Sequence, residues 1–125
     1  MARDYSSRLS AERKGRKGET LAMIFLMLKG YRIIARRYKT KLGEVDIIAR
    51  KRDVVAMVEV KARASLLEAM DAVDFSTMKR IESAGDIWLS KQRDYAQLNI
   101  RYDLIAILPR KWPVHVESLF QARGW

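Results

Sequence analysis

Four charged residues stand in two neighbouring segments that otherwise have the apolar, β-branched composition of buried strands. Glu44 and Asp46 lie in the first segment, and Glu59 and Lys61 lie in the second. Because successive side chains of a strand point to opposite faces, Glu44 shares a face with Asp46, and Glu59 shares a face with Lys61. A short connection pairs two strands as an antiparallel hairpin, so Asp46 and Glu59 are predicted to face the same way.

These residue types match the needs of phosphodiester hydrolysis. The reaction requires a nucleophilic water, neutralisation of charge on the phosphorane and help for the leaving oxygen, and divalent ions can supply all three. Mg²⁺ and Mn²⁺ prefer oxygen ligands and keep several waters, so two or three carboxylates suffice. A neighbouring lysine can orient the water or stabilise transition-state charge. Asp46, Glu59 and Lys61 are therefore a candidate hydrolytic site, and a cross-strand ion pair of Lys61 with either carboxylate is the alternative that spacing alone leaves open.

The elements that must position these residues follow from the pattern of the chain. We predict a single α/β domain over residues 1–125, with a mixed four- to five-stranded sheet flanked by helices. Three strands in quick succession form an antiparallel meander, and a strand that follows a long helix can pair in parallel. The predicted strands are 31–38, 44–50, 54–63, 99–108 and 114–119, and the predicted helices are 11–29, 66–72 and 75–92.

The first predicted helix is apolar nearly all round at its C-terminal end, which predicts burial on most sides. Gly30 stands where a left-handed helix cap belongs. Met23, Ile24 and Met27 are expected to leave apolar surface that a small monomer does not cover, which makes a homodimer a further prediction. The apolar run 21–28 is far shorter than the roughly 20 residues of a membrane span. We therefore expect a cytoplasmic protein with no membrane partner.

The chain is strongly basic, with 25 Lys and Arg against 15 Asp and Glu and a formal charge of +10. Residues 29–41 carry much of this excess and include no acid, and residues 1–10 are predicted to form a flexible basic arm. Such a surface attracts nucleic acid in a salt-dependent way. The chain has no cysteine, which excludes disulfides and thiolate metal sites.

The two charged segments also carry a resemblance. GEVDIIA (43–49) and VEVKAR (58–63) together resemble the signature of the small bacterial YraN family, which is identified as a member of the PD-(D/E)xK, or restriction-endonuclease-like, nuclease superfamily. Further matches at 18–22 and 101–103 extend the resemblance over about 15–107. It implies a restriction-endonuclease-like αβββαβ core and a metal-dependent nuclease that acts on nucleic acid, with DNA and its branched or flapped structures as candidate substrates. The alternative is a non-catalytic nucleic-acid-binding module or adaptor that retains the nuclease fold.

The resemblance also implies roles for individual residues. Asp46 is the bridging carboxylate on Mg²⁺ or Mn²⁺, Glu59 is the second acidic ligand, and the backbone carbonyl of Val60 is a third ligand. Lys61 is the catalytic lysine. Glu19, on the first helix, is the additional acid of Holliday-junction-resolvase-like members, and an ordinary helix acid or a partner for a nearby arginine is an equal alternative.

Basic residues near these acids are candidates for phosphate binding. They are Arg36, Arg37, Lys39, Lys41, Arg63 and Lys79. Many relatives have Arg-Asn where this chain has Arg36 and Arg37, and the change adds phosphate-binding charge. Two other polar residues are expected to be structural: Asp103, as support for the sheet or for an arginine, and His115, as a structural or surface residue.

Overall fold

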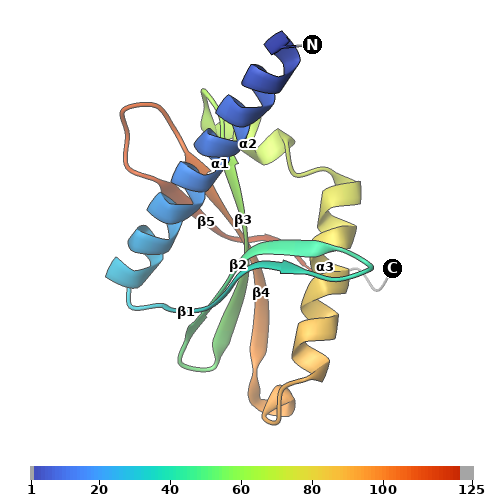
Figure 1. The fold of residues 1–125 in the computed structure, drawn as a ribbon. Helices are drawn as coiled ribbons and strands as arrows, with labels where there is room; N and C mark the ends of the chain where they lie inside the picture. The colour runs from blue at the N-terminus through green and yellow to red at the C-terminus, as the bar shows by residue number, and fades with distance from the viewer. Residues whose placement is uncertain (1, 122–125) are drawn as a thin grey trace.

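The computed structural model describes residues 2–121, with side chains from residue 15 onward, and consists of a five-stranded sheet with helices on both faces (Figure 1). The strands lie in the order β1-β2-β3-β4-β5; β3 and β4 are parallel, and the other neighbours are antiparallel. This confirms the predicted α/β class and mixed sheet. The elements are α1 (Ala2–Leu28), β1 (Arg32–Lys39), β2 (Glu44–Lys51), β3 (Val54–Ala62), α2 (Leu66–Asp71), α3 (Phe75–Ser90), the 3₁₀ turn η1 (Tyr95–Gln97), β4 (Asn99–Ile107) and β5 (Val114–Phe120).

Helix α1 begins at Ala2, well before the predicted start at residue 11. The helix therefore includes most of the segment 1–10 for which a flexible arm is predicted. Side chains of residues 1–14 lie outside the described part of the chain, and the flexibility of the arm stays a prediction. Within residues 2–121, no helix combines the length and apolar character needed to cross a bilayer.

The C-terminus of α1 is closed by the predicted left-handed cap at Gly30, whose φ is 93°. The N–H of Gly30 donates to the carbonyl of Met27 at 3.0 Å, and the N–H of Tyr31 donates to that of Leu26 at 3.0 Å. This pair of bonds satisfies two helix carbonyls that would otherwise lack partners. It also turns the chain directly into β1.

Only one side of α1 is buried, so the prediction of burial on most sides is wrong. Ala22, Met23 and Leu26 pack against the sheet, whereas Ile24 and Met27 are 46% and 53% exposed. The reason is that α2 and α3 pack with the core on the other face of the sheet, so among the described residues nothing covers the outer side of α1. Met23 is therefore not part of the exposed surface from which a homodimer is predicted, and the homodimer stays a prediction.

The end of the β1–β2 hairpin bends over α3 (Figure 1). A Cβ placed on Gly43 would lie 1.9 Å from the carbonyl oxygen of Arg80, so only glycine fits at this contact. Val45 packs with the α3-side core, whereas Ile47 packs with the α1-side core. Strict alternation would put both on one face, so the bend changes the direction of β2 at Asp46.

Candidate functional site

The pairing of β2 with β3 ends at Ile47 and Val58, so that Asp46, the residue that precedes Ile47, lies just outside the paired part of β2. Oδ2 of Asp46 accepts a hydrogen bond of 2.8 Å from the backbone N–H of Val60. The carboxylate thus takes the place of a backbone acceptor where the two strands separate. Asp46 is held at the opening between the strands, and it remains half-buried there.

The carboxyl groups of Asp46 and Glu59 lie close enough for each to change the pKa of the other. Burial, and then the negative charge of Asp46, raises the pKa of Glu59 to about 7. The pKa of Asp46 is also raised, first by burial and then by the charge of Glu19, against the opposing effect of the Val60 hydrogen bond. Two close carboxylates in a partly dry site cannot both ionise without cost. Glu59 is therefore the carboxyl that takes up a proton as the pH falls below about 7.

Lys61 completes this group, because its Nζ lies 3.3 Å from Oε1 of Glu59. The side chains of Lys61 and Glu59 are 23% and 12% exposed, so the lysine side chain is the more accessible of the two. The structure therefore brings Asp46, Glu59 and Lys61 together, as their spacing predicts. The ion pair of Lys61 with Glu59 that the spacing left open is therefore also present, although both residues lie on β3 and the pair is not a cross-strand one.

Glu19 approaches the group from α1, but an arginine holds its carboxylate. Nε of Arg37 donates to Oε1 and Oε2 of Glu19 at 3.1 and 3.0 Å, and Nη2 lies 2.9 Å from Oε2. Across the described side chains, no set of three or more His, Cys, Asp or Glu residues is arranged to hold a metal ion. The partner predicted as one alternative for Glu19 is thus present, and its role as a metal ligand stays a prediction.

A pocket of about 330 Å³ on the α1 side is shared by Glu19, Arg37 and Asp46, whereas Glu59 and Lys61 do not line it. It is lined by Gly15, Arg16, Glu19, Arg37, Lys39, Glu44, Val45 and Asp46. Its lining includes both cationic and anionic side chains, so that it offers oxygen ligands and guanidinium donors within one space. Arg16 has no place among the predicted site residues, because one basic residue on a highly charged helix gives no signal of its direction.

The backbone of Arg37 adopts a left-handed conformation inside β1, with φ at 48°. Its position in the register, between the pairs Arg36–Ile47 and Tyr38–Val45, places it opposite Asp46. This conformation costs a side-chain-bearing residue roughly 1–2 kcal/mol, and Asn tolerates it better than Arg.

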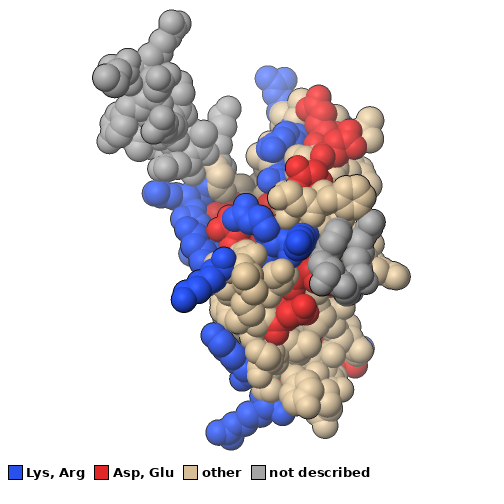
Figure 2. All heavy atoms as spheres, turned by 90° about the vertical axis from the view of Figure 1, so that its right-hand side faces the viewer, with Lys and Arg blue, Asp and Glu red and all other residues tan. Residues whose placement is uncertain are grey.

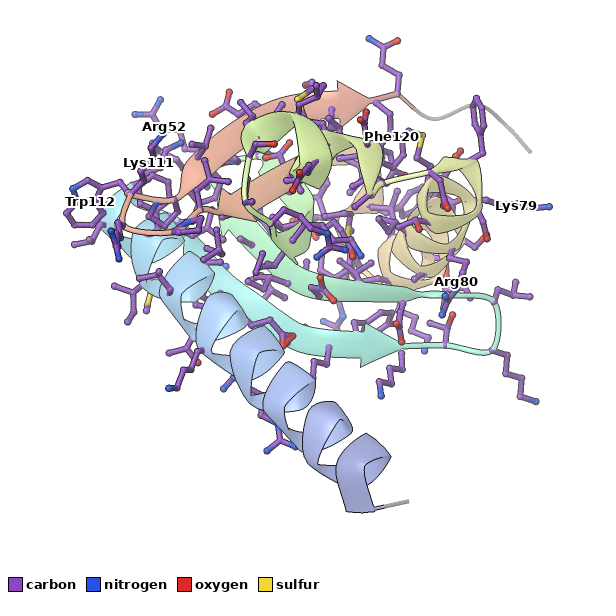
Figure 3. All side chains as sticks on the ribbon, turned by 90° about the horizontal axis from the view of Figure 1, so that it is seen from above. Arg52, Lys79, Arg80, Lys111, Trp112 and Phe120 are labelled. Carbon is purple, nitrogen blue, oxygen red and sulfur yellow. The ribbon has the colours of Figure 1, made fainter. Side chains whose placement is uncertain are left out.

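Glu44 has a partner on α3 that the sequence pattern does not identify. Nη2 of Arg80 lies 3.6 Å from Oε1 of Glu44. Figure 3 shows Arg80 directed toward the β1–β2 hairpin and its neighbour Lys79 directed away from the sheet. Helical periodicity alone does not decide which of these two adjacent residues faces the hairpin. The bend of the hairpin decides it, and that bend is a tertiary feature.

The basic residues of the hairpin lie on the surface beside this site. Arg36, Arg37, Lys39 and Lys41 are exposed, and Figure 2 shows Lys and Arg side chains along one border of the molecule and beside acidic side chains at its middle. Arg63 is exposed too, but its Nη1 donates to the carbonyl of Ala62 at 2.8 Å. Together with Leu21 and Pro109 it lines a mostly apolar pocket of about 500 Å³, which is a different pocket from the one that Asp46 lines.

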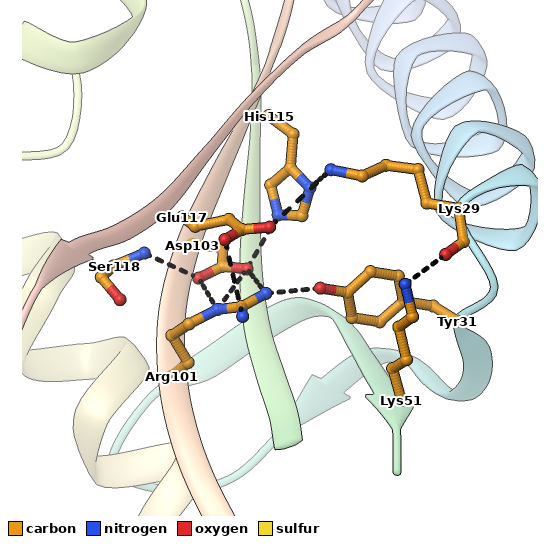
Figure 4. A network of polar contacts seen from close by, with 8 residues as sticks. All are labelled: Lys29, Tyr31, Lys51, Arg101, Asp103, His115, Glu117 and Ser118. Carbon is orange, nitrogen blue, oxygen red and sulfur yellow. Dashed lines mark hydrogen bonds and ion pairs between the residues drawn. The ribbon is translucent and has the colours of Figure 1, made fainter. Parts of the chain in front are cut away.

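A second polar cluster lies at the other end of α1 and is centred on the buried Asp103 (Figure 4). Arg101 donates to both oxygens of Asp103 at 2.8–3.1 Å, and the N–H of Ser118 donates to Oδ1 at 3.0 Å. Nε2 of His115 lies 2.8 Å from Oδ2, and its Nδ1 lies 2.6 Å from Nζ of Lys29. A carboxylate only accepts and an ammonium only donates, so a neutral His115 with its proton on Nε2 satisfies both.

This cluster has a structural role, in agreement with the expectations for Asp103 and His115. Burial alone would raise the pKa of Asp103, but the hydrogen bonds from His115 and Arg101 outweigh it and hold that pKa below its usual range. Nη2 of Arg101 also donates to the hydroxyl of Tyr31. The network therefore fixes the end of α1 and the start of β1 to β4 and β5.

Comparison with known proteins places these residues in a family. The model of the uncharacterised protein family UPF0102 matches residues 18–107. A UPF0102 protein of Chelativorans sp. is 62% identical over 117 residues, which cover 94% of each chain. A UPF0102 protein of Mesorhizobium japonicum is 56% identical over 98% of each chain. A UPF0102 protein of Agrobacterium fabrum is 50% identical over 92% of this chain and 94% of its own. The family match includes Glu19, Asp46, Glu59 and Lys61, and the chain belongs to the UPF0102 family.

Proposed function

We propose that the protein is a divalent-metal-dependent nuclease that hydrolyses phosphodiester bonds in DNA. The observation that carries this proposal is the cluster of Asp46, Glu59 and Lys61, in which two partly buried carboxyl groups have raised pKa values and Nζ of Lys61 lies 3.3 Å from Glu59. Two acids with raised pKa values in one partly buried site are costly to stability and are typical of functional sites. A bound cation would remove their mutual repulsion.

The donor set suits Mg²⁺ or Mn²⁺. These ions take oxygen ligands and are commonly held by one or two carboxylates together with waters and substrate phosphates. Val60 adds a third oxygen: residues of an antiparallel ladder direct their N–H and C=O to the same side, so the Val60 carbonyl points toward the opening, as its N–H does toward Asp46. A cation bound there would neutralise phosphate charge and lower the pKa of a coordinated water.

The remaining roles belong to the side chains around this group. Lys61, with Glu59 at 3.3 Å, orients the attacking water or stabilises the charge that develops on the phosphate. Arg36, Lys39 and Lys41 on the hairpin contact the DNA backbone and position it without reading sequence. The resemblance to the YraN family and to PD-(D/E)xK nucleases supports the same assignment, with branched or flapped DNA as the substrate class.

The test is a cleavage assay on labelled branched and linear DNA, with Mn²⁺ or with EDTA. We expect cleavage products with Mn²⁺ and none with EDTA. The cleavage rate should fall on the order of 100-fold or more in Glu59→Gln and in Lys61→Ala, while both variants still bind DNA. Lys111→Ala is the matched control, because Lys111 is exposed in the β4–β5 connection, well away from the hairpin (Figure 3). DNA binding that is equal in Mn²⁺ and EDTA, with no product at any protein concentration, would instead identify a non-catalytic binding module.

A further inference from the structure

Arg37 and Glu19 form an ion pair. In a nuclease site the same guanidinium would bind a phosphate, and the same carboxylate would bind a cation. The guanidinium binds both carboxylate oxygens at 2.9–3.1 Å. Glu19 is 12% exposed, whereas Arg37 is 43% exposed and faces the pocket that Asp46 also lines. The fork of donors on arginine matches carboxylate and phosphate equally well. In this structure the guanidinium of Arg37 binds the carboxylate of Glu19.

The backbone conformation of Arg37 is the second feature of this pair. Arg37 keeps a left-handed φ of 48° at the position opposite Asp46, where a non-glycine residue is strained. From this position the side chain reaches Glu19 on α1. Arginine at this position can bind Glu19 through two donors and keeps its charge at every pH at which the protein is folded.

We propose that Arg37 is an exchangeable phosphate-binding residue that occupies Glu19 until a divalent cation takes that carboxylate, so that cation and DNA phosphate bind cooperatively. The inference rests on the proposed nuclease function. When Glu19 turns toward a cation beside Asp46, the bidentate contact with Arg37 breaks inside the same pocket, and the donors of that contact bind a phosphate of the DNA instead. Linkage makes the effect reciprocal, because a phosphate that engages Arg37 also releases Glu19 for the cation.

The test measures Mn²⁺ affinity by electron paramagnetic resonance of free Mn²⁺, with and without branched DNA, in a Lys61→Ala background that leaves the DNA uncut. In this parent protein, DNA is expected to tighten Mn²⁺ binding by about 5-fold or more. Arg37→Asn, which suits the left-handed backbone, is expected to bind Mn²⁺ about 5-fold tighter without DNA and to lose most of the DNA effect. Arg52→Asn is the matched control, because Arg52 has a φ of 59° in the β2–β3 turn, at the opposite end of β2 from Asp46.

A double-mutant cycle with Glu19→Gln separates the exchange from a simple loss of positive charge. If Arg37 and the cation exchange on Glu19, Arg37→Asn should no longer tighten Mn²⁺ binding in the Glu19→Gln background, where the side chain at position 19 has no charge. A tightening that persists in the Glu19→Gln background, or an Arg37→Asn protein that binds Mn²⁺ no better than the parent, overturns the inference and leaves the nuclease proposal intact. An absence of Mn²⁺ binding in every variant and in the native protein overturns both.

Discussion

The backbone N–H of Val60 donates to Asp46 at 2.8 Å, at the point where β2 leaves β3. This bond fixes one carboxylate of the proposed cation site before any ligand arrives. Glu59 then lies close to this carboxylate, and its pKa rises to about 7 as a result of burial and that neighbouring charge. Several consequences of this arrangement are measurable.

Cation binding should release a proton near neutral pH. Glu59 is protonated below a pKa of about 7, whereas a metal ligand must be ionised, so Mn²⁺ displaces the proton. Calorimetric titrations at pH 6.5 in buffers of different ionisation enthalpy are expected to show this release, and the apparent affinity should increase with pH until it levels off above 7. Glu59→Gln is expected to abolish the release. Identical heats in all buffers would show that Glu59 does not give up a proton to the cation.

The same carboxyl should make the folded protein less stable as pH rises. The pKa of Glu59 is about 7 in the folded protein, against an ordinary value of 4.5 for a solvated glutamate, so between these values the unfolded chain loses a proton that the folded chain keeps. Stability therefore falls with rising pH across this window, by about 1.4 kcal/mol per unit of pKa difference before screening. Urea unfolding at pH 4.5 and 8 should show the fall in the native protein and a smaller fall in Glu59→Gln. Asp71→Asn, at an exposed carboxyl on α2, is the control that should retain it.

The Asp103 network should contribute far more to stability than an exposed ion pair. Asp103→Asn leaves the guanidinium of Arg101 and the imidazole of His115 without their shared anion inside the protein, at a cost of about 3–5 kcal/mol. The control is Asp94→Asn, which breaks a 3.2 Å pair with Arg50 whose acid is 40% exposed, and it should cost no more than about 1 kcal/mol. Similar unfolding midpoints for the two variants would contradict this assignment.

Gly43 should be intolerant of any side chain. An alanine Cβ would overlap the Arg80 carbonyl at 1.9 Å, which forces the hairpin away from α3 and costs about 1–3 kcal/mol. Gly15, also a glycine of the described chain, has nothing within 4 Å of a Cβ and lies in α1, so Gly15→Ala should be neutral or stabilise by up to about 1 kcal/mol. Chemical denaturation of both variants tests the contrast. A Gly43→Ala protein as stable as the native one would show that the hairpin does not depend on this contact.

Local sequence patterns account for most of the fold, because strand alternation, turn length and caps are properties of neighbouring residues. Gly30 as a helix cap and the β2–β3 hairpin that joins Asp46 to Glu59 are of this kind. The N-terminal extent of α1 does not follow from the pattern, because Gly15 and Gly18 lower helix propensity in its middle. The exposed outer face of α1 does not follow either, because an all-round apolar pattern does not say how many helices cover one face of a sheet.

The site is predictable only in part, for a physical reason. Asp46, Glu59 and Lys61 meet through one hairpin, and its register follows from spacing. The pairing of Glu19 with Arg37, the left-handed Arg37 backbone and the contact of Arg80 with Glu44 all depend on how α1 and α3 pack on the sheet. Such contacts join residues far apart in the chain, and side-chain type alone does not select them. For this reason the sequence pattern points to Lys79 on α3 and passes over Arg80.

Anomalous diffraction from crystals soaked in Mn²⁺ tests the central claim most directly. The account predicts an anomalous peak within coordination distance, about 2.1 Å for ions of this kind, of carboxylate oxygens of both Asp46 and Glu59. The peak should disappear in Asp46→Asn and Glu59→Gln double-variant crystals. A fully occupied soak with no peak between these two side chains, or with peaks only elsewhere on the surface, would contradict the metal site and the nuclease mechanism built on it.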